Sequence, residues 1–261
     1  MLLLPPCAPC LQDPAPVSME AVAAELAGKG VRFDPERGLI ELDGRIAQTY
    51  EPLEYLLVAR PKGKDYEALL AVEDVSVGAL NTALLLAGME PGRNAKFALV
   101  QPPPTPEEMA QGAPAYTVEP PAGTGMYIYV WWEEEVRDAA GARSERYFYR
   151  AEDLVLNARS ERTYQRGPWI YLGSRFVRPH KDAPELFAAE AEGNLVSIVY
   201  FDPSNQLMTG SDPEADNQHV WYPNFYLLPE IGHPVKILFS REPLDAPPPT
   251  LNAPASAEGG R

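Results

Sequence analysis

The sequence predicts an α+β protein with a mixed or mostly antiparallel β-sheet of about eight or more strands, two main helices and flexible, proline-rich termini. Many short apolar segments rich in aromatic and β-branched residues alternate with loops that contain glycine or proline, which is typical of strands. Only two stretches carry apolar residues at helical spacing. Both ends of the chain are rich in proline and lack apolar periodicity, so we expect them to be flexible.

The chain divides into one foldable region and two ends. Residues 1–17 form a proline-rich segment that we interpret as a signal remnant or a linker, with Met1 as a late start inside or just after a longer export signal. Residues 18–241 are expected to form a single α+β domain with a long proline-rich surface loop at 102–125. Residues 242–261 are predicted to be a disordered tail rich in proline and alanine.

Two helices are predicted from the spacing of apolar residues. The first follows Ser18, which can serve as its N-cap, and Gly28 or Gly30 can end it in a left-handed conformation. The second lies between residues 75 and 88 and is expected to bury one face. The apolar residues of that face are Val77, Leu80, Leu84 and Ala87.

The remaining apolar segments are predicted to be strands. Segments 55–59 and 66–72 are joined by a short basic loop with a glycine, so we expect them to pair as a hairpin. The aromatic-rich segments 126–136 and 144–150 are expected to form a second hairpin. Further strands are predicted at 31–42 (two pieces around a turn), 96–101, 169–177, 185–192, 194–201 and 234–240.

The charge balance restricts the partners. Lysine and arginine together number 22 against 37 aspartate and glutamate residues, which gives a net charge of −15. This charge repels a phosphate backbone and an anionic membrane surface, so we expect no nucleic-acid partner. No segment approaches the roughly 18 to 20 apolar residues of a membrane span, so we expect no transmembrane segment. The partner is expected to be a protein or a small molecule, and the location extracytoplasmic (periplasmic or secreted), with the cytoplasm as the alternative.

The aromatic residues of the predicted strands are candidates for a binding surface. Because successive side chains of a strand point to opposite faces, part of these rings is expected to face outward and to form a ligand or partner surface. The alternative is that helices and loops cover both faces, so that the rings belong to the core. These residues are Trp131, Trp132, Trp169, Trp221, Tyr127, Tyr129, Tyr147, Tyr149 and Tyr171.

The leading functional hypothesis is a noncatalytic, extracytoplasmic binding or accessory module, because no catalytic motif is recognisable. The candidate binding residues are Ser174, Arg175, Asp202, Asn205, Trp221 and Asn224. The alternative is a hydrolase or metal-dependent enzyme with its site near the first four of these residues. Ser174, however, lies in Gly-Ser-Arg-Phe rather than in the G-x-S-x-G elbow of a hydrolase. The alternative for this segment is a structural role, in which the glycine before Ser174 permits a bend and Arg175 pairs with a carboxylate.

A redox module is the second alternative. Cys7 and Cys10 form a C-x-x-C pair, but no helix begins beside them, and no second pair or nearby histidine completes a zinc site. No cofactor or metal site is predicted. Calcium is the ion whose preferred oxygen ligands occur together in the acidic loop from Asp202 to Asn217, and a solvated turn is the alternative for that loop.

Several segments occur in a distinctive order roughly between residues 50 and 240. They read PLEYLLVA, YEALL, ALNTALLLAGMEPG, AEDLVLN, WIYLGSRF, GNLVSIVYFDPSNQL and WYPN. In the order and spacing of these segments, the chain resembles the YdjY domain family of uncharacterised bacterial, often planctomycete, proteins. The resemblance implies a single domain and no settled activity. Relatives often have histidine where this chain has Tyr66. Some are described as ferredoxin-like, but an iron–sulfur cluster needs more thiolates than the two cysteines here.

Overall fold

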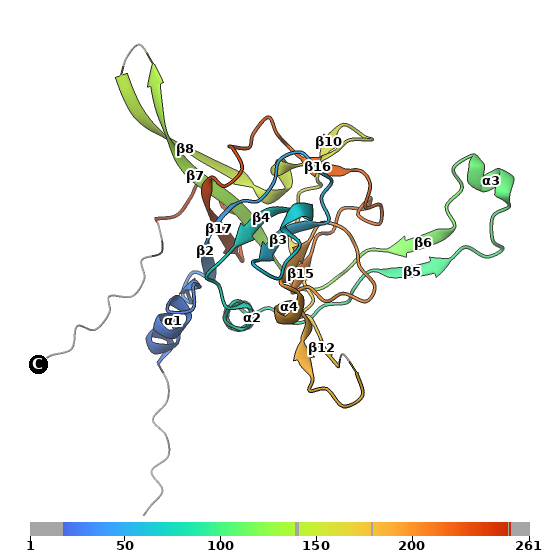
Figure 1. Ribbon diagram of the computed structural model, residues 1–261, viewed down its shortest axis with the longest axis horizontal. Helices are drawn as coiled ribbons and strands as arrows, with labels where there is room; N and C mark the ends of the chain where they lie inside the picture. The colour runs from blue at the N-terminus through green and yellow to red at the C-terminus, as the bar shows by residue number, and fades with distance from the viewer. Residues whose placement is uncertain (1–17, 139–140, 179, 250, 252–261) are drawn as a thin grey trace, which may run out of the picture.

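The computed structural model describes residues 18–138, 141–178, 180–249 and 251. At its centre the strands follow the order β2-β17-β7-β11-β15-β14-β3-β4, and the series closes because β4 also pairs with β2. Within the described residues this ring contains eight strands and forms a closed barrel (Figure 1). Most neighbouring strands are antiparallel, but β3–β4 and β14–β15 are parallel. The predicted α+β class with a mixed sheet is confirmed, whereas the closure of the sheet was not predicted.

The strands fall into the barrel and several smaller sheets. The ring consists of β2 (Leu39–Ile46), β3 (Tyr55–Ala59), β4 (Ala68–Val72), β7 (Gly125–Asp138), β11 (Trp169–Tyr171), β14 (Asn194–Ser197), β15 (Met208–Thr209) and β17 (Pro234–Ser240). Beside it, β1 (Arg32–Asp34) pairs with β2, and β8 (Gly141–Arg150) pairs with β7. The smaller sheets are β9 (Val155–Asn157) with β10 (Arg162–Thr163) and β16 (Trp221–Pro223), β12 (Phe176–Val177) with β13 (Leu186–Phe187), and β5 (Lys96–Leu99) with β6 (Tyr116–Glu119).

The two predicted main helices are confirmed as α1 (Met19–Ala27) and α2 (Val77–Leu86). Ser18 caps α1, since its Oγ accepts a 3.2 Å hydrogen bond from a backbone N–H of the first turn. Gly30, with a φ of 80°, takes the left-handed conformation that follows α1, whereas Gly28 stays right-handed. None of the helices in the described part of the chain is long and apolar enough to cross a membrane.

Two short helices lie where the sequence predicted none. α3 (Pro106–Ala110) falls within the expected loop at 102–125. α4 (Ala188–Glu192) replaces most of the strand predicted at 185–192. Its residues, AAEAE, favour a helix, and Gly193 ends it with a left-handed φ of 74°.

The pairing of β3 with β4 corrects the predicted hairpin. The two strands are parallel, with Tyr55 opposite Ala68. The connection between them returns along β3 and includes a 3-10 turn, η1 (Asp65–Glu67). Gly63 lies so close to β3 that a Cβ there would be 2.5 Å from the side chain of Val58. This close return, rather than a tight turn, gives both strands the same direction.

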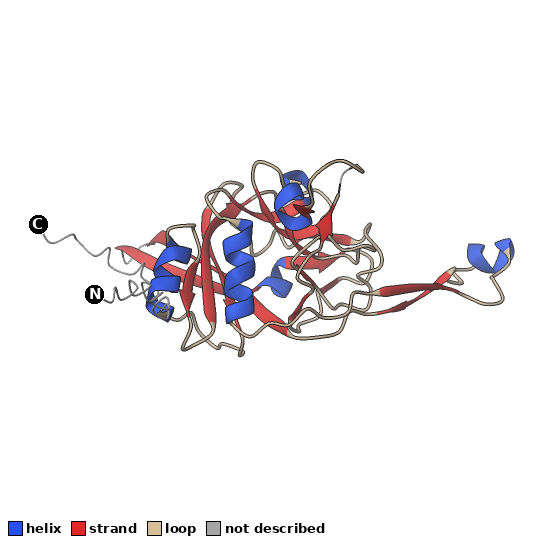
Figure 2. Cartoon of the chain, turned by 90° about the horizontal axis from the view of Figure 1, so that it is seen from below, coloured by secondary structure: helices blue, strands red, loops and turns tan. Residues whose placement is uncertain are grey.

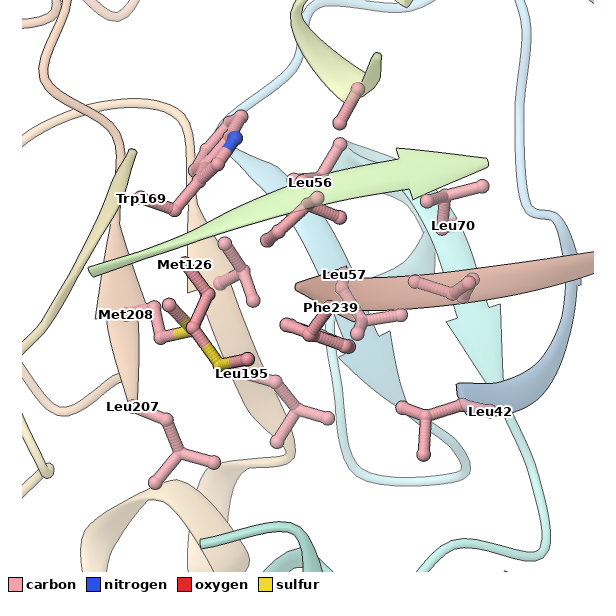
Figure 3. Packing of buried hydrophobic residues seen from close by; sticks show 14 of the residues in the cluster. Leu42, Leu56, Leu57, Leu70, Met126, Trp169, Leu195, Leu207, Met208 and Phe239 are labelled. Atoms are coloured by element: carbon pink, nitrogen blue, oxygen red, sulfur yellow. The ribbon is translucent and has the colours of Figure 1, made fainter. Parts of the chain in front are cut away.

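Apolar side chains fill the interior of the ring (Figure 3). Alternation along β17 sends Ile237 and Phe239 inward, and Ile237 pairs with Leu42 of β2. All three side chains are fully buried. The predicted apolar face of α2 is also buried and joins the same core.

An arm projects from the barrel (Figures 1 and 2). β5 and β6 pair with each other, with Leu99 opposite Tyr116, and α3 lies at the far end. The segment 102–125, expected to be a loop, therefore contributes α3 and β6 to this arm. It projects because its strands add to no other sheet in the described part of the chain.

The C-terminal segment lies against the outer face of the barrel. Leu244 and Leu251 pack with Tyr129 and Leu238, and the N–H of Leu244 donates a 2.7 Å hydrogen bond to the Tyr129 hydroxyl. In the described part of the tail that was predicted to be disordered, these residues pack against the barrel and cover apolar side chains outside the ring. The remainder of the tail and the proline-rich N-terminal segment lie outside the described residues.

Candidate ligand-binding groove

Most aromatic residues of the strands are buried. The four tryptophans are buried together with Tyr129 and Tyr171, and Tyr127, Tyr147 and Tyr149 are half-buried. Of the two interpretations of the strand aromatics, the one that places the rings in the core therefore holds for most of them, and these rings form no exposed surface. Closure of the sheet encloses one face, and loops with the C-terminal segment cover much of the other. Trp221, a predicted binding residue, is fully buried and cannot touch a ligand directly.

The exposed rings that gather into one site lie in loops. Tyr50, Phe225 and Tyr226 expose 76%, 55% and 79% of their surfaces. Together with Tyr222 they line a groove of about 800 Å³, which we call the aromatic groove. Its walls also include Thr49, Leu156, Glu161, Asn224 and Leu227.

β16 places two neighbouring aromatic residues on opposite sides. Trp221 lies opposite Asn157 of β9, and Tyr222 lies opposite Leu156. Alternation therefore directs Trp221 into the core and Tyr222 toward the groove. The Trp221 ring packs on Tyr164, with the ring centroids 4.8 Å apart. The buried ring of Trp221 thus anchors β16 to the core, and Tyr222 belongs to the lining of the groove.

A buried glutamine holds the loop that carries Tyr50. The Oε1 atom of Gln48 accepts 2.9 Å hydrogen bonds from the N–H groups of Tyr50 and Glu51, and its Nε2 donates to the carbonyl of Glu51 at 3.0 Å. The N–H of Leu53 donates to the carbonyl of Trp221 at 2.9 Å. These bonds fix the loop to β16, so the Tyr50 ring stays in solvent without packing of its own.

Asn224, a predicted site residue, lies in the wall of the groove. Its N–H donates to the carbonyl of Leu154 and its Nδ2 to the carbonyl of Asp153, each at 2.8 Å. The Oδ1 atom is buried and has no hydrogen-bond partner among the described residues. A buried acceptor without a partner costs free energy. The Oδ1 atom of Asn224 can therefore accept one further hydrogen bond.

The turn after β9 forms another wall. Asn157 is buried, and its Oδ1 accepts 3.0 Å hydrogen bonds from the N–H groups of Arg159 and Ser160. Glu161 follows with a φ of 51°, an uncommon conformation for a residue with a side chain. Among the described residues that line the groove, Glu161 is the one charged side chain.

An ion-pair network contacts the ring of Trp221. Arg162 donates hydrogen bonds of 2.6 and 2.8 Å to Asp212 and one of 3.1 Å to Glu214. Its guanidinium carbon lies 5.7 Å from the centre of the Trp221 ring. Burial raises the pKa of Asp212, but hydrogen bonds from Arg162 and from two backbone N–H groups outweigh it, so the pKa lies below its usual value. The ionised carboxylate of Asp212 therefore holds the Arg162 guanidinium over the Trp221 ring.

The same network bears on the expectation of calcium. Asp212 and Glu214 belong to the acidic loop considered for that ion, and arginine side chains already occupy both carboxylates. Across the described ranges, no group of three or more histidine, cysteine, aspartate or glutamate side chains is placed to hold a metal ion. The predicted redox pair, Cys7 and Cys10, lies outside the described residues.

Three other predicted site residues come together away from the groove. Ser174 Oγ donates to the carbonyl of Asn205 at 2.6 Å and accepts from the N–H of Ala189 at 3.1 Å. Arg175 Nε donates to Asn205 Oδ1 at 2.6 Å. Both partners of the serine hydroxyl are backbone groups, and Ser174 has a φ of 59°, so the cluster fixes a turn at the start of α4. Asp202 lies exposed in the loop that precedes Asn205.

Three tyrosine hydroxyls of the aromatic groove are free to donate hydrogen bonds. The hydroxyl groups of Tyr50, Tyr222 and Tyr226 have no hydrogen-bond partner within the described part of the chain. Phe225 and Tyr226 form a tilted ring pair with centroids 4.1 Å apart. The groove therefore combines apolar ring surface with several free O–H donors, and none of its described lining residues is a lysine or arginine.

A second hollow of about 800 Å³ lies beside the β7–β8 ribbon and is ionic. Its cations are paired with carboxylates: Arg45 with Glu73 at 2.9 Å, Arg146 with Glu133, and Lys236 with Asp43. The guanidinium of Arg146 also lies over Trp131, 5.3 Å from the ring centre. Because these charges satisfy one another, we take the aromatic groove as the candidate site.

Comparison of the chain with protein-family models, with curated proteins and with solved structures finds no match. The groove is therefore defined by its own residues. Sequence reasoning named Asn224 but missed the four aromatic residues of the groove, Tyr50, Tyr222, Phe225 and Tyr226. The signal was the run Trp-Tyr-Pro-Asn-Phe-Tyr, because Pro223 ends a strand and leaves two consecutive aromatic residues in the turn that follows.

Proposed function

We propose that the protein is a noncatalytic binding module whose aromatic groove receives a proline-rich segment in the polyproline II conformation. The observation that carries the proposal is the gathering of Tyr50, Tyr222, Phe225 and Tyr226 around one groove. Polyproline II segments leave their carbonyl groups free of internal hydrogen bonds, and aromatic-lined grooves are a recurring way of recognising them.

The chemistry of the groove matches such a ligand in two respects. Aromatic rings bury a large area against proline rings at a low cost in side-chain entropy. The free hydroxyls of Tyr50, Tyr222 and Tyr226 can donate to the carbonyl groups of the ligand, which has no N–H at proline. An anionic ligand fits less well, because Glu161 is the one charge in the described lining.

An extracytoplasmic location and membership of the YdjY domain family stay proposals. The family proposal is supported by the order of the sequence segments from PLEYLLVA to WYPN. Fractionation of the native host tests the location, and a structure of an undisputed family member tests the kinship through the strand order of its barrel.

Calorimetric titration with a synthetic oligoproline peptide tests the binding function. We expect the wild-type chain to bind and Tyr226→Ala to weaken binding by at least about tenfold, since tyrosines that a ligand covers are typical hot spots of recognition. Tyr226 is 79% exposed, so the substitution should change the free energy of unfolding by no more than about 0.5 kcal/mol.

Two further variants sharpen this titration. Tyr66→Ala removes a tyrosine of η1 that is 62% exposed and is not among the residues lining the groove, so it should bind as the wild type does. Tyr226→Phe keeps the ring and removes the hydroxyl, so it should bind more weakly than the wild type and more tightly than Tyr226→Ala. A chain that binds an oligosaccharide but no oligoproline would refute the proposed ligand class.

A further inference from the structure

The arm formed by β5, α3 and β6 has apolar surface without a cover. An isolated two-stranded ribbon is at best marginally stable in water, and this one projects from the barrel (Figure 2). Leu99 and Tyr116, which face each other across the ribbon, are 60% and 53% exposed. Phe97 and Met109 add further exposed apolar surface along the arm. Such a ribbon is suited to contact another molecule.

The far end of the arm carries an exposed proline run. Residues 102–106 read Pro-Pro-Pro-Thr-Pro, and all except the half-buried Pro104 are exposed. Thr105 has φ −67° and ψ 160°, close to polyproline II geometry. A capping box fixes the end of the run: Thr105 Oγ1 accepts a 3.2 Å bond from the N–H of Glu108, and the Glu108 carboxylate accepts a 2.8 Å bond from the N–H of Thr105. The capping box therefore holds Thr105 in an extended conformation, and α3 begins at Pro106.

We propose that residues 102–105 of the proline run of one copy of the chain occupy the aromatic groove of a second copy. This inference rests on the proposed function of the groove. The run offers proline rings and carbonyl acceptors, and the groove offers the rings and O–H donors that complement them. The other proline run of the described chain, at 247–249, is not free in the same way, because its Pro248 is buried against the body of the protein.

Electrostatics predicts how this contact responds to salt. Each copy carries a net charge of −15, and Glu107 and Glu108 beside the proline run approach Glu161 at the rim of the groove. These like charges repel, and the contact itself is apolar and uncharged. Added salt screens the repulsion, so self-association strengthens as the salt concentration rises, opposite to an association driven by ion pairs.

Two complementary variants separate the arm from the groove. In the first, residues 99–116 are replaced by Asn-Gly, which joins Ala98 to Thr117, a directly paired position of the ribbon. This chain keeps its groove and lacks the proline run. In the second, Tyr226→Ala, the chain keeps the arm and has a damaged groove. Tyr66→Ala serves as the control that keeps both.

The test is sedimentation equilibrium combined with light scattering over a concentration series. We expect the wild type and Tyr66→Ala to self-associate, and each of the two variants alone to associate at least about tenfold more weakly. An equimolar mixture of the two variants should form a heterodimer, because the arm of the Tyr226→Ala chain meets the intact groove of the other. Circular dichroism verifies that every variant is folded.

Each outcome decides between the two proposals. Suppose that the variant with Asn-Gly in place of residues 99–116 binds oligoproline but the wild type stays monomeric at every concentration. The groove then binds proline-rich segments, and the contact between copies is refuted. If the wild type associates and neither variant weakens it, the arm-to-groove contact is wrong. If no proline peptide binds any chain with an intact groove, the proposed function itself fails.

Discussion

The rings of Tyr50 and Tyr226 remain in solvent because buried amides, rather than packing of the rings, hold their loops. Gln48 fixes the first loop through three hydrogen bonds, and Asn224 fixes the second through its side chain and its backbone. Buried amides with good geometry hold a loop firmly, because breaking them leaves polar groups without partners. The residues that position the groove are therefore polar and buried, and those that contact the ligand are aromatic and exposed.

Asp212 provides a prediction at the residue scale. Asp212→Asn removes the charge that holds Arg162 over the Trp221 ring, and we expect it to lower the free energy of unfolding by about 2 kcal/mol at neutral pH. The folded-state pKa of Asp212 lies below its ordinary value of 3.8. The stabilisation is therefore complete above that pH and is lost as the pH falls through the folded-state pKa.

Urea unfolding over a pH series checks this prediction. The difference between wild type and Asp212→Asn should be constant at neutral and mildly acidic pH and should shrink below about pH 3.8. A difference that stays unchanged down to the acid limit would show that the charge of Asp212 contributes nothing to stability.

At the scale of elements, the side chain of Trp221 packs the small sheet of β9, β10 and β16 against the core. Trp221 is fully buried and contacts Tyr164, whose hydroxyl donates a 2.8 Å hydrogen bond to the carbonyl of Ile198. Trp221→Ala leaves a large cavity, so we expect a loss of about 3 to 5 kcal/mol in the free energy of unfolding. Chemical denaturation measures it, with Tyr116→Ala on the exposed arm as a control that should change stability by about 0.5 kcal/mol or less. A loss from Trp221→Ala no larger than that of the control would contradict this anchoring role.

Local sequence signals predicted the elements whose formation depends on their own residues. The helix after Ser18, the apolar face of α2 and the long β7–β8 hairpin follow from capping, helical spacing and aromatic content. The parallel pairing of β3 with β4 was missed because it depends on the fit of Gly63 against the neighbouring strand. α4 was missed because apolar residues around 185–192 resemble a strand over so short a range.

At the scale of the whole molecule, the barrel brings distant segments to one site. The groove combines residues near 49–50, 156–161 and 222–227, which no local pattern relates to one another. The closing pair, β2 with β4, likewise has no signal in either strand alone. The sequence therefore predicted the class of the fold and Asn224 of the groove, whereas the closure and the gathering of exposed rings depend on pairing between distant strands.

The central claim is that the aromatic groove receives proline-rich segments, and a nuclear magnetic resonance titration of the labelled full-length chain with oligoproline tests it most directly. We predict saturable shifts of the backbone amide signals in segments 48–51, 156–161 and 222–227, and little change around Ser174 and Asn205. Shifts centred on that serine cluster or on the ionic hollow beside β7 and β8, or no shifts at all, would contradict the account.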